Sequence, residues 1–180
     1  MSATFLFYEV TSMTKKSRNL THAAIIAALY AVLTHLQNLL LPGSATWAIQ
    51  CRLSEALCIL AFFTPAAIPG LTVGCFLFNI TFATALPLDM VLGTLATFLA
   101  TLGMRLTRHV TFRALPILGL LMPALTNAVL VGWELTMYVG GGFWLNALYV
   151  ALGELIVLLT LGTGLFWLIR DRHLDKRLFG

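Results

Sequence analysis

Residues Leu20–Leu41 read LTHAAIIAALYAVLTHLQNLLL, a run without a single Lys, Arg, Asp or Glu. About 20 predominantly apolar residues make a helix long enough to cross the hydrocarbon core of a bilayer. A helix is needed there because lipid offers no hydrogen-bond partner to backbone N–H and C=O groups. The stretch therefore predicts a transmembrane helix.

Five more apolar runs follow, and Pro65, Pro69 and Gly70 lie between or at the edges of the second and third. Because proline and glycine interrupt or bend helices, these two short runs could also form one long broken hairpin. We expect an all-α integral membrane protein, a single compact bundle of six transmembrane helices joined by short loops. The six predicted runs are Leu20–Leu41, Leu53–Ile68, Gly70–Ala85, Leu88–Leu106, Ala114–Val139 and Phe143–Ile169.

The composition of the chain agrees with a membrane protein. Hydrophobic residues make up 59% of the 180 residues and charged residues 10%, whereas a soluble domain carries about 25% charged residues. The mean hydropathy is +0.92. This length leaves room for one compact domain, so six helices fit only if their connections are short.

Basic residues predict the direction of the helices. They gather before the first run and after the fourth and sixth, and six spans place these three clusters on one side. Since cytoplasmic loops carry an excess of Lys and Arg, that side is the expected cytoplasm, with both termini in it. The net charge of +4 then reflects topology in a prokaryotic-type plasma membrane, without nucleic-acid binding. The clusters are Lys15, Lys16 and Arg18; Arg105, Arg108 and Arg113; and Arg170, Arg172, Lys176 and Arg177.

The chain divides into a membrane domain and two tails. We expect residues 1–19 to be a partly disordered cytoplasmic tail, residues 20–169 the six-helix domain, and residues 170–180 a basic cytoplasmic tail. The first residues do not resemble a secretory signal, because the positive charges follow the short apolar stretch. Met13 begins a stretch that resembles a more natural start, so the sequence leaves open whether residues 1–12 belong to the native protein.

Five charged side chains lie in or next to the expected outer halves of the apolar runs. Each costs about 2.5–3.5 kcal/mol near the centre of a bilayer, so such residues mark function by default. All lie toward the expected outer ends, and four acids against one base predict an acidic pocket for a ligand with cationic or N–H donor groups. The predicted substrate-binding residues are Arg52, Glu55, Asp89, Glu134 and Glu154, with the uncharged Gln50, Asn79, Asn127, Trp133, Trp144 and Asn146.

Structural roles compete with this interpretation. The tryptophans favour the headgroup region as interfacial anchors. Arg52 and Glu55 are three residues apart and could pair on one helical face, and Asp89 could cap the N-terminus of its helix. Glu154 has the weakest structural explanation, because its sequence neighbours are apolar.

Small residues line two neighbouring ridges of the first predicted helix. Such residues four apart let a second helix backbone approach closely in lipid. Packing inside the bundle and contact with another protein are equally compatible with this spacing. The candidate partner-binding residues are Ala23, Ala27 and Ala31 on one ridge, and Ala24 and Ala28 on the next.

Enzymatic motifs are missing from the sequence, and we predict no catalytic residue and no enzyme activity. There is no GxxxxGK[ST] phosphate loop, no HExxH and no GxSxG. Cys51, Cys58 and Cys75 have no CxxC spacing, so we interpret them as small apolar side chains without a metal.

Several segments together resemble the QueT family of substrate-binding S components of energy-coupling factor transporters. The similarity covers nearly the whole chain after Met13, and Cys51 departs from it where an aromatic or apolar residue is more usual. The segments that carry the resemblance are Ile49–Leu57, Ile68–Cys75, Asn79, Asp89–Thr97, Phe143–Trp144 and Ala151–Leu155.

The resemblance implies a small six-helix subunit that captures a queuosine precursor, a vitamin-like deazaguanine base, from outside. It implies docking on a scaffold membrane protein and two cytoplasmic ATPases, which would use the ATP; the chain itself would hold no cofactor. In this group of transporters an alanine-spaced face of the first helix contacts the scaffold. The sequence does not distinguish queuine from its precursors, nor a dedicated module from a shared one.

The expected ligand suggests roles for the polar side chains. Glu55 or Glu154 would accept hydrogen bonds from the guanine-like edge, and Asp89 or Glu134 would neutralise an aminomethyl cation. Arg52 with Gln50 and Asn146 would donate to the carbonyl oxygen. Trp133 or Trp144 would stack on the ring.

Two other classes of function remain. A stand-alone secondary transporter could relay protons through Glu154 or Asp89, although the sequence contains no convincing inverted repeat. An intramembrane enzyme with paired carboxylates lacks a nucleophile or metal constellation to support it.

Overall fold

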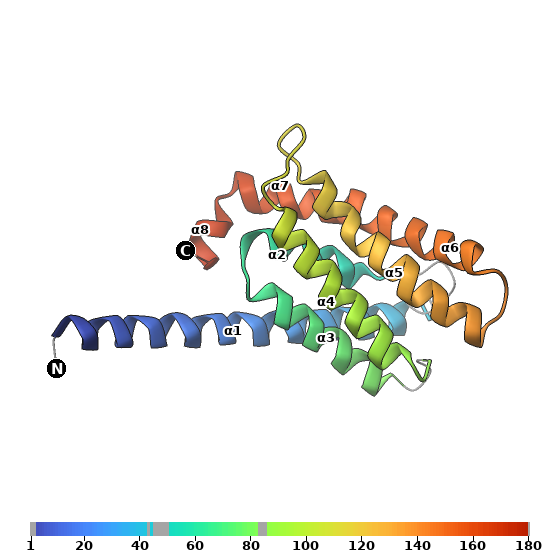
Figure 1. The fold of residues 1–180 in the computed structure, drawn as a ribbon, viewed down its shortest axis with the longest axis horizontal. Helices are drawn as coiled ribbons and strands as arrows, with labels where there is room; N and C mark the ends of the chain where they lie inside the picture. Colours follow the sequence, from blue (N-terminus) through green and yellow to red (C-terminus); the bar gives the residue numbers. More distant parts are fainter. Residues whose placement is uncertain (1–2, 43, 45–50, 83–85, 180) are drawn as a thin grey trace.

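The computed structural model describes residues 3–42, 44, 51–82 and 86–179, and this part of the chain is helical apart from turns and one isolated bridge between Phe112 and Leu115. The all-α prediction is therefore confirmed. The elements, drawn in Figure 1, are α1 (Ala3–Leu40), the 3₁₀ helix η1 (Leu53–Ile59), α2 (Leu60–Phe63), α3 (Ala67–Thr81), α4 (Asp89–Thr107), α5 (Ile117–Tyr138), α6 (Phe143–Val157), the π-helix η2 (Leu158–Gly162), α7 (Thr163–Asp171) and α8 (Leu174–Phe179).

The helices pack as neighbours in chain order around η1. α1 packs on α3, α3 on α4, α4 on α5, and α5 on α6 (Figure 1). η1 contacts elements from α1 through α7, so it occupies the centre of the bundle. The segment that carries Arg52 and Glu55 is consequently surrounded by protein.

Four helices are long and apolar enough to cross a membrane among the described residues, where the sequence predicts six. They are Thr14–Leu40, Asp89–Thr107, Ile117–Tyr138 and Phe143–Asp171. The second and third predicted spans correspond to shorter apolar helices, Leu53–Phe63 and Ala67–Thr81.

Proline explains the shorter second and third helices. α2 ends at Phe63 because Thr64 has extended backbone angles (φ −133°, ψ 136°) and Pro65 follows. α3 begins at Ala67, three residues before the predicted start at Gly70, and includes Pro69. That proline lies in the first turn of α3, where its missing N–H has no helical partner to lose. The boundary predicted between these runs was therefore wrong, although the break itself was expected.

Part of the predicted N-terminal tail, residues 1–19, belongs to the first helix. α1 begins at Ala3 and continues without interruption to Leu40. No Gly or Pro occurs before Pro42, so nothing in the sequence stops the helix earlier. The basic tail of residues 170–180 likewise contains the short helix α8.

The structure also differs from the fifth predicted run at its start and from the sixth in its interior. α5 begins at Ile117 and not at Ala114, because Arg113 and Ala114 have positive φ angles of 48° and 67° and cannot continue a helix. The sixth run is divided by the π-turn η2. Between α5 and α6, Gly140 and Gly141 have φ angles of 87° and 82° and form a tight turn.

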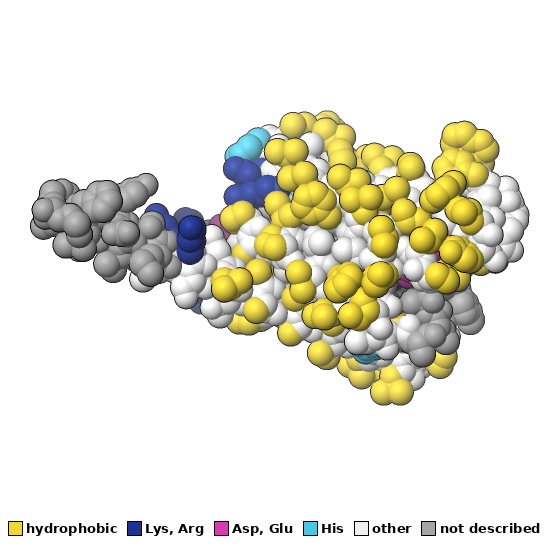
Figure 2. All heavy atoms as spheres, turned by 60° about the horizontal axis from the view of Figure 1, so that its bottom comes forward, with side chains coloured by type: hydrophobic (Ala, Val, Ile, Leu, Met, Phe, Trp, Pro, Cys, Tyr) yellow, Lys and Arg dark blue, Asp and Glu magenta, His cyan; other side chains and the backbone are white. Residues whose placement is uncertain are grey.

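The surface of the bundle is largely apolar. Figure 2 shows hydrophobic side chains over much of its flank, whereas Lys and Arg gather toward one end. The interior beneath η1 is an apolar cluster that includes Ile59, Leu71, Met104, Leu120 and Phe166. Because soluble proteins rarely expose large apolar patches, this surface is that of a membrane protein.

The two alanine ridges of α1 have different environments. A side-chain carbon on Gly70 would lie 2.8 Å from the Ala23 carbonyl oxygen, and one on Gly74 would lie 2.8 Å from that of Ala27. Ala27 is buried, whereas Ala24 and Ala28 are exposed. The first ridge therefore packs against α3 inside the bundle, and the second is left at the surface.

Candidate functional site

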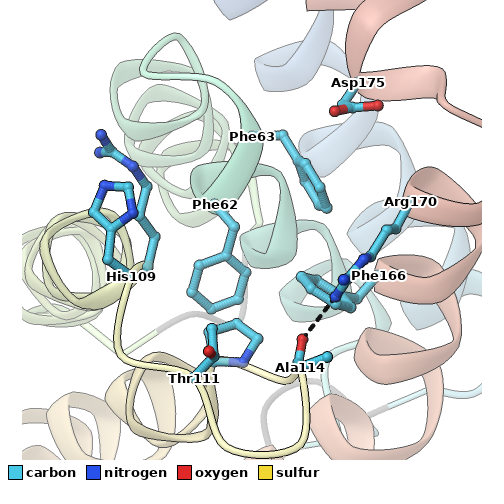
Figure 3. A pocket seen from close by; sticks show the side chains of 10 residues that line it. Phe62, Phe63, His109, Thr111, Ala114, Phe166, Arg170 and Asp175 are labelled. Atoms are coloured by element: carbon cyan, nitrogen blue, oxygen red, sulfur yellow. Dashed lines mark hydrogen bonds between the residues drawn. The ribbon is translucent and has the colours of Figure 1, made fainter.

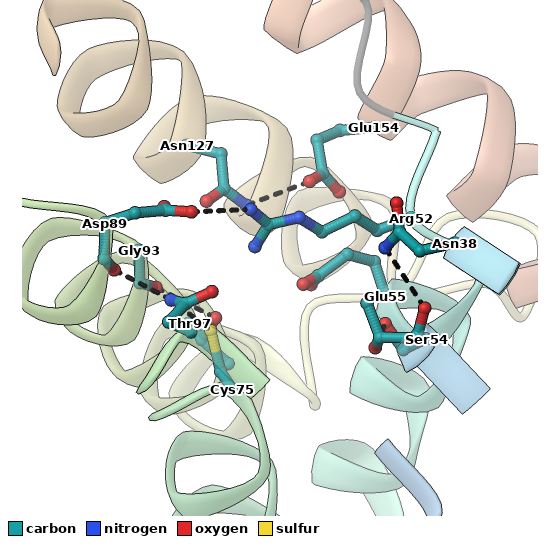
Figure 4. Close-up of polar contacts among 12 residues, drawn as sticks. Asn38, Arg52, Ser54, Glu55, Cys75, Asp89, Gly93, Thr97, Asn127 and Glu154 are labelled. Atoms are coloured by element: carbon teal, nitrogen blue, oxygen red, sulfur yellow. Dashed lines mark hydrogen bonds and ion pairs between the residues drawn. The ribbon is translucent and has the colours of Figure 1, made fainter. Parts of the chain in front are cut away.

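The five ionisable residues identified in the apolar runs are all buried near the centre of the fold. Their side chains come from the start of η1, the start of α4, the last turns of α5, and α6, and Figure 4 shows most of them turned toward one another. Their exposed fractions are 3% for Arg52, 1% for Glu55, 5% for Asp89, 0% for Glu134 and 2% for Glu154. This group is here called the acidic cluster.

Arg52 and Asp89 form a buried ion pair. The Arg52 Nη2 atom lies 3.2 Å from Asp89 Oδ2, and the Arg52 guanidinium also lies 5.8 Å from the centre of the Phe78 ring. Asp89 is the first residue of α4, after Leu88 at the N-cap position, and its Oδ1 atom has no hydrogen-bond partner within the described residues. Its carboxylate thus serves the ion pair and not the helix-capping role considered as an alternative.

Glu55 is held by two donors from neighbouring elements. The Tyr30 hydroxyl of α1 donates to Oε1, and the Cys58 thiol of η1 lies 3.1 Å from Oε2. Both carboxylate oxygens therefore have a protein partner. Hydrogen bonds to a buried carboxylate offset part of its desolvation cost, so Glu55 is fixed in place.

Glu154 has a partner on one side only. Asn127 Nδ2 of α5 donates to Glu154 Oε1 across 3.1 Å. The second oxygen, Oε2, has no hydrogen-bond partner within the described residues. Asn127, predicted as a site residue, thus orients the carboxylate and leaves one oxygen for another donor.

Glu134 is the least satisfied of the acids. It is completely buried in α5, and neither carboxylate oxygen has a partner in the part of the chain that the structure describes. It follows Asn127 by seven residues on α5, so both side chains lie on the same face of the helix, the face on which Asn127 contacts Glu154. An isolated buried carboxylate is costly unless it is paired or hydrogen-bonded, so a group of this kind calls for an external partner.

Asn79 and Gly93 shape the cluster beside Asp89. Asn79 Nδ2 donates to the Asp89 backbone oxygen across 2.7 Å. A side-chain carbon on Gly93 would lie 2.6 Å from Asp89 Oδ1 and 3.0 Å from Asn79 Nδ2. Gly93 is therefore the residue that leaves room for these two polar side chains against α4.

Gln37 of α1 fixes the segment that enters η1. Its amide nitrogen donates to the Ser44 hydroxyl at 2.9 Å and to the Cys51 carbonyl at 2.6 Å, and its amide oxygen accepts from the Leu53 backbone N–H at 2.7 Å. These three bonds flank Arg52 on both sides in sequence. Gln37 is a positioning residue for the guanidinium.

Four predicted site residues are not brought into the acidic cluster or are not described. Trp133 and Trp144 are 47% and 83% exposed, because they face outward as interfacial tryptophans do. Asn146 donates to Thr136 Oγ1 and the Gly140 backbone oxygen, both at 3.0 Å, so it ties the glycine turn to the ends of α5 and α6. Gln50 lies outside the described residues.

Several polar residues of the site were missed in the sequence. Tyr30, Thr34 and Asn38 are buried on one face of α1, and Thr34 bonds the Ser54 hydroxyl at 2.7 Å. Their spacing of four residues was a usable signal, because it places three polar groups on one stripe of an otherwise apolar helix. Thr97 of α4 is also buried and bonds its own helix.

Metal binding has no support among the described residues, since no group of three or more His, Cys, Asp or Glu side chains is arranged to hold an ion. The three cysteines are unpaired. Cys58 and Cys75 are buried in the core, but each also has a polar partner, Glu55 for Cys58 and Asn79 for Cys75, which the prediction of small apolar side chains did not include.

The acidic cluster offers a ligand mainly hydrogen-bond acceptors. The cluster contains one guanidinium and four carboxyl groups. The carboxyl oxygens without a described partner are Asp89 Oδ1, both oxygens of Glu134, and Glu154 Oε2. A ligand that supplies N–H donors or a positive charge satisfies such a site, and hydrogen bonds to carboxylates are about twice as strong as neutral ones.

The chain was compared with families of known proteins. Residues 20–171 match the model of a family described as QueT transporter. Neither the curated proteins nor the solved structures contain a match to this chain.

Proposed function

The chain belongs to the QueT transporter family and is a membrane transporter protein, and we propose that it is the substrate-binding S component of an energy-coupling factor importer. Its ligand would be a deazaguanine base, queuine or one of its precursors, captured from outside the cell. The chain would have six spans and cytoplasmic termini, and it would catalyse no reaction.

The observation that carries this proposal is the set of buried carboxylate oxygens without a described partner. A guanine-like edge presents adjacent N–H donors, and a precursor with an aminomethyl group adds a cation. Both satisfy carboxylates that otherwise cost folding free energy.

Hydrogen bonding divides the acids into two groups. Glu55 already accepts from Tyr30 and Cys58, whereas Glu154 keeps one oxygen for a ligand. We therefore assign the guanine-like edge to Glu154 and not to Glu55. Asp89 is neutralised by Arg52, so we assign the aminomethyl cation to Glu134.

The distribution of charge supports the orientation. The acidic cluster lies where α1 and α3 end and α4 begins, and the basic residues lie toward the opposite end of the bundle (Figure 2). With the basic end in the cytoplasm, the cluster belongs to the outer half of the membrane.

Docking on a scaffold protein would use the exposed alanine row of α1. Ala24 and Ala28 are exposed together with Ile25, Leu29 and Val32. Small residues in an apolar face allow close contact with a second helix. Ala27 cannot serve this contact as the chain is folded, because it is buried against α3.

Binding to the purified chain tests the proposal. Queuine and its aminomethyl precursor should each bind in calorimetry with a Kd of about 1 µM or tighter, and adenine should not. Adenine is the matched control because its edge lacks the paired donors of guanine. No binding of either deazaguanine at a concentration of about 100 µM would contradict the assignment.

A stand-alone proton-coupled transporter is the second candidate, because Glu134 is a buried carboxyl group without a described partner. Uptake by vesicles that contain this chain alone, abolished by an uncoupler, would favour it. The importer instead requires the scaffold and ATPases for any uptake.

A further inference from the structure

A second polar site lies at the opposite end of the bundle from the acidic cluster. An open pocket with a volume of about 350 Å³ lies between the ends of α2 and α4, the turn before α5, and the helices α7 and α8. Figure 3 shows the rings of Phe62, Phe63 and Phe166 between His109 on one side and Arg170 on the other. We call this open pocket the basic-end pocket.

The pocket carries an excess of positive charge. Arg108, His109 and Arg170 line it, against the single acid Asp175. Arg170 Nη1 donates to the Ala114 backbone oxygen at 2.9 Å, and Arg108 Nη1 donates to the Arg105 backbone oxygen at 3.2 Å. These bonds fix each guanidinium and leave most of its five N–H donors for an anion.

The position of the pocket matches the headgroup level of a bilayer. The span of α4 ends at Thr107, that of α5 begins at Ile117, and the last span ends at Asp171. Arg108, His109 and Arg170 therefore stand where apolar helices emerge from hydrocarbon. Basic pockets at such a level are suited to anionic lipid headgroups.

Exposed apolar residues lie close along the chain to the basic residues of the pocket. Leu106 is 72% and Val110 58% exposed, and both neighbour Arg108 in sequence. The Trp167 ring lies 5.4 Å from the Arg170 guanidinium, an arrangement typical of aromatic residues at a membrane interface. A ligand that combines an anionic head with acyl chains would use both features, whereas a soluble anion would use only the charges.

We propose that the basic-end pocket binds the headgroup phosphate of an anionic phospholipid. Planar guanidinium groups bind phosphate through paired hydrogen bonds, and the acyl chains would lie along Leu106 and Val110. This inference depends on the membrane placement of the chain and is independent of the substrate proposed for the acidic cluster.

Native mass spectrometry of the full chain with added lipid tests this site. Phosphatidylglycerol should bind at least about tenfold more tightly than phosphatidylcholine with identical acyl chains. The variant Arg108→Gln/Arg170→Gln should lose this preference. The matched control Arg172→Gln/Arg177→Gln, which removes two exposed charges outside the pocket, should keep it within about threefold.

A folding defect is separated from a binding defect by a second variant. Arg108→Gln alone disturbs only a bond within its own stretch of chain, so its circular dichroism should be unchanged while the preference for phosphatidylglycerol falls several-fold. A folded Arg108→Gln chain with an undiminished preference would overturn the proposal.

Other occupants give distinct results. Inorganic phosphate that displaces phosphatidylglycerol at equal concentration would assign the site to a free anion. An equal loss in the control pair would show general charge attraction. If the double variant kept its lipid preference but no longer bound the scaffold and ATPases, the occupant would be an acidic protein segment. Each of these outcomes overturns the lipid assignment.

Discussion

The Arg52 guanidinium donates to the Asp89 carboxylate across 3.2 Å, and this pair joins the start of η1 to the start of α4. Both side chains are buried, so the pair is formed away from lipid and bulk water. Glu55 is bound by Tyr30 and Cys58, so Glu134 and Glu154 are the acids outside this pair that keep carboxylate oxygens without a described partner. The acid that Arg52 contacts therefore decides which carboxylates of the acidic cluster are left for a ligand.

Removing the cation should destabilise the fold. Arg52→Met keeps the length of the side chain but leaves Asp89 buried without its ion-pair partner. Breaking a buried pair by removing one member costs about 3–5 kcal/mol of unfolding free energy. Equilibrium unfolding in mixed micelles measures it. Arg172→Met, at an exposed position, is the control, and a loss in Arg52→Met as small as in this control would show that the pair is not structural.

Gly93→Ala should damage the site through steric contact. The added carbon would lie 2.6 Å from Asp89 Oδ1, so Asp89 must move, and ligand affinity should fall with a stability loss of about 1–3 kcal/mol. Gly164→Ala is the matched control, a helical glycine with open space around it. It should bind ligand normally and gain up to about 1 kcal/mol in stability. Equal ligand affinity in the two variants would contradict the role of Gly93.

The two alanine rows of α1 should respond differently to leucine. Ala27→Leu should destabilise the chain by about 1–3 kcal/mol, because Ala27 packs directly against α3. Ala28→Leu should leave the unfolding free energy unchanged and abolish co-purification with the scaffold protein and ATPases. An Ala28→Leu chain that still assembles would remove this row from the proposed interface.

Glu134→Gln should weaken ligand binding without destabilising the fold. No described hydrogen bond is lost, and a buried charge is removed, so the stability of the free chain should stay level or rise. Affinity for the aminomethyl precursor should fall at least about tenfold, whereas affinity for a deazaguanine base that lacks a cationic side group should fall less. Calorimetry with the two ligands checks the difference. An equal loss of affinity for both ligands would mean that Glu134 does not bind the cation.

Sequence patterns predicted the long spans better than the short ones. The run Leu88–Leu106 differs from α4 by one residue at each end, because length and hydropathy alone define such a helix. The η1–α2 segment was expected to be part of a span from Leu53 to Ile68. It ends at Phe63 because Pro65 and the extended Thr64 break it. Such a short buried helix depends on the packing around it, which local sequence does not contain.

The sequence predicted which acidic residues form the candidate site. It did not predict which side chains pair with one another. Ionisable groups cannot face lipid cheaply, so the five charged residues had to meet inside the bundle. Local spacing suggested a pair of Arg52 with Glu55, whereas the structure gives Arg52 an ion pair with Asp89 from another helix. In the sequence, Tyr30 resembles any aromatic residue of an apolar helix. Its hydroxyl donates a hydrogen bond to Glu55, and this contact can be seen only in the folded structure.

Calorimetric titration of the double variant Glu134→Gln/Glu154→Gln with the aminomethyl precursor tests most directly whether the buried carboxylates capture the ligand. The double variant should bind at least about a hundredfold more weakly than the unmodified chain. The control Asp171→Asn/Asp175→Asn, acids at the basic end, should bind as the unmodified chain does. An unchanged affinity in the folded Glu134→Gln/Glu154→Gln protein would contradict the account.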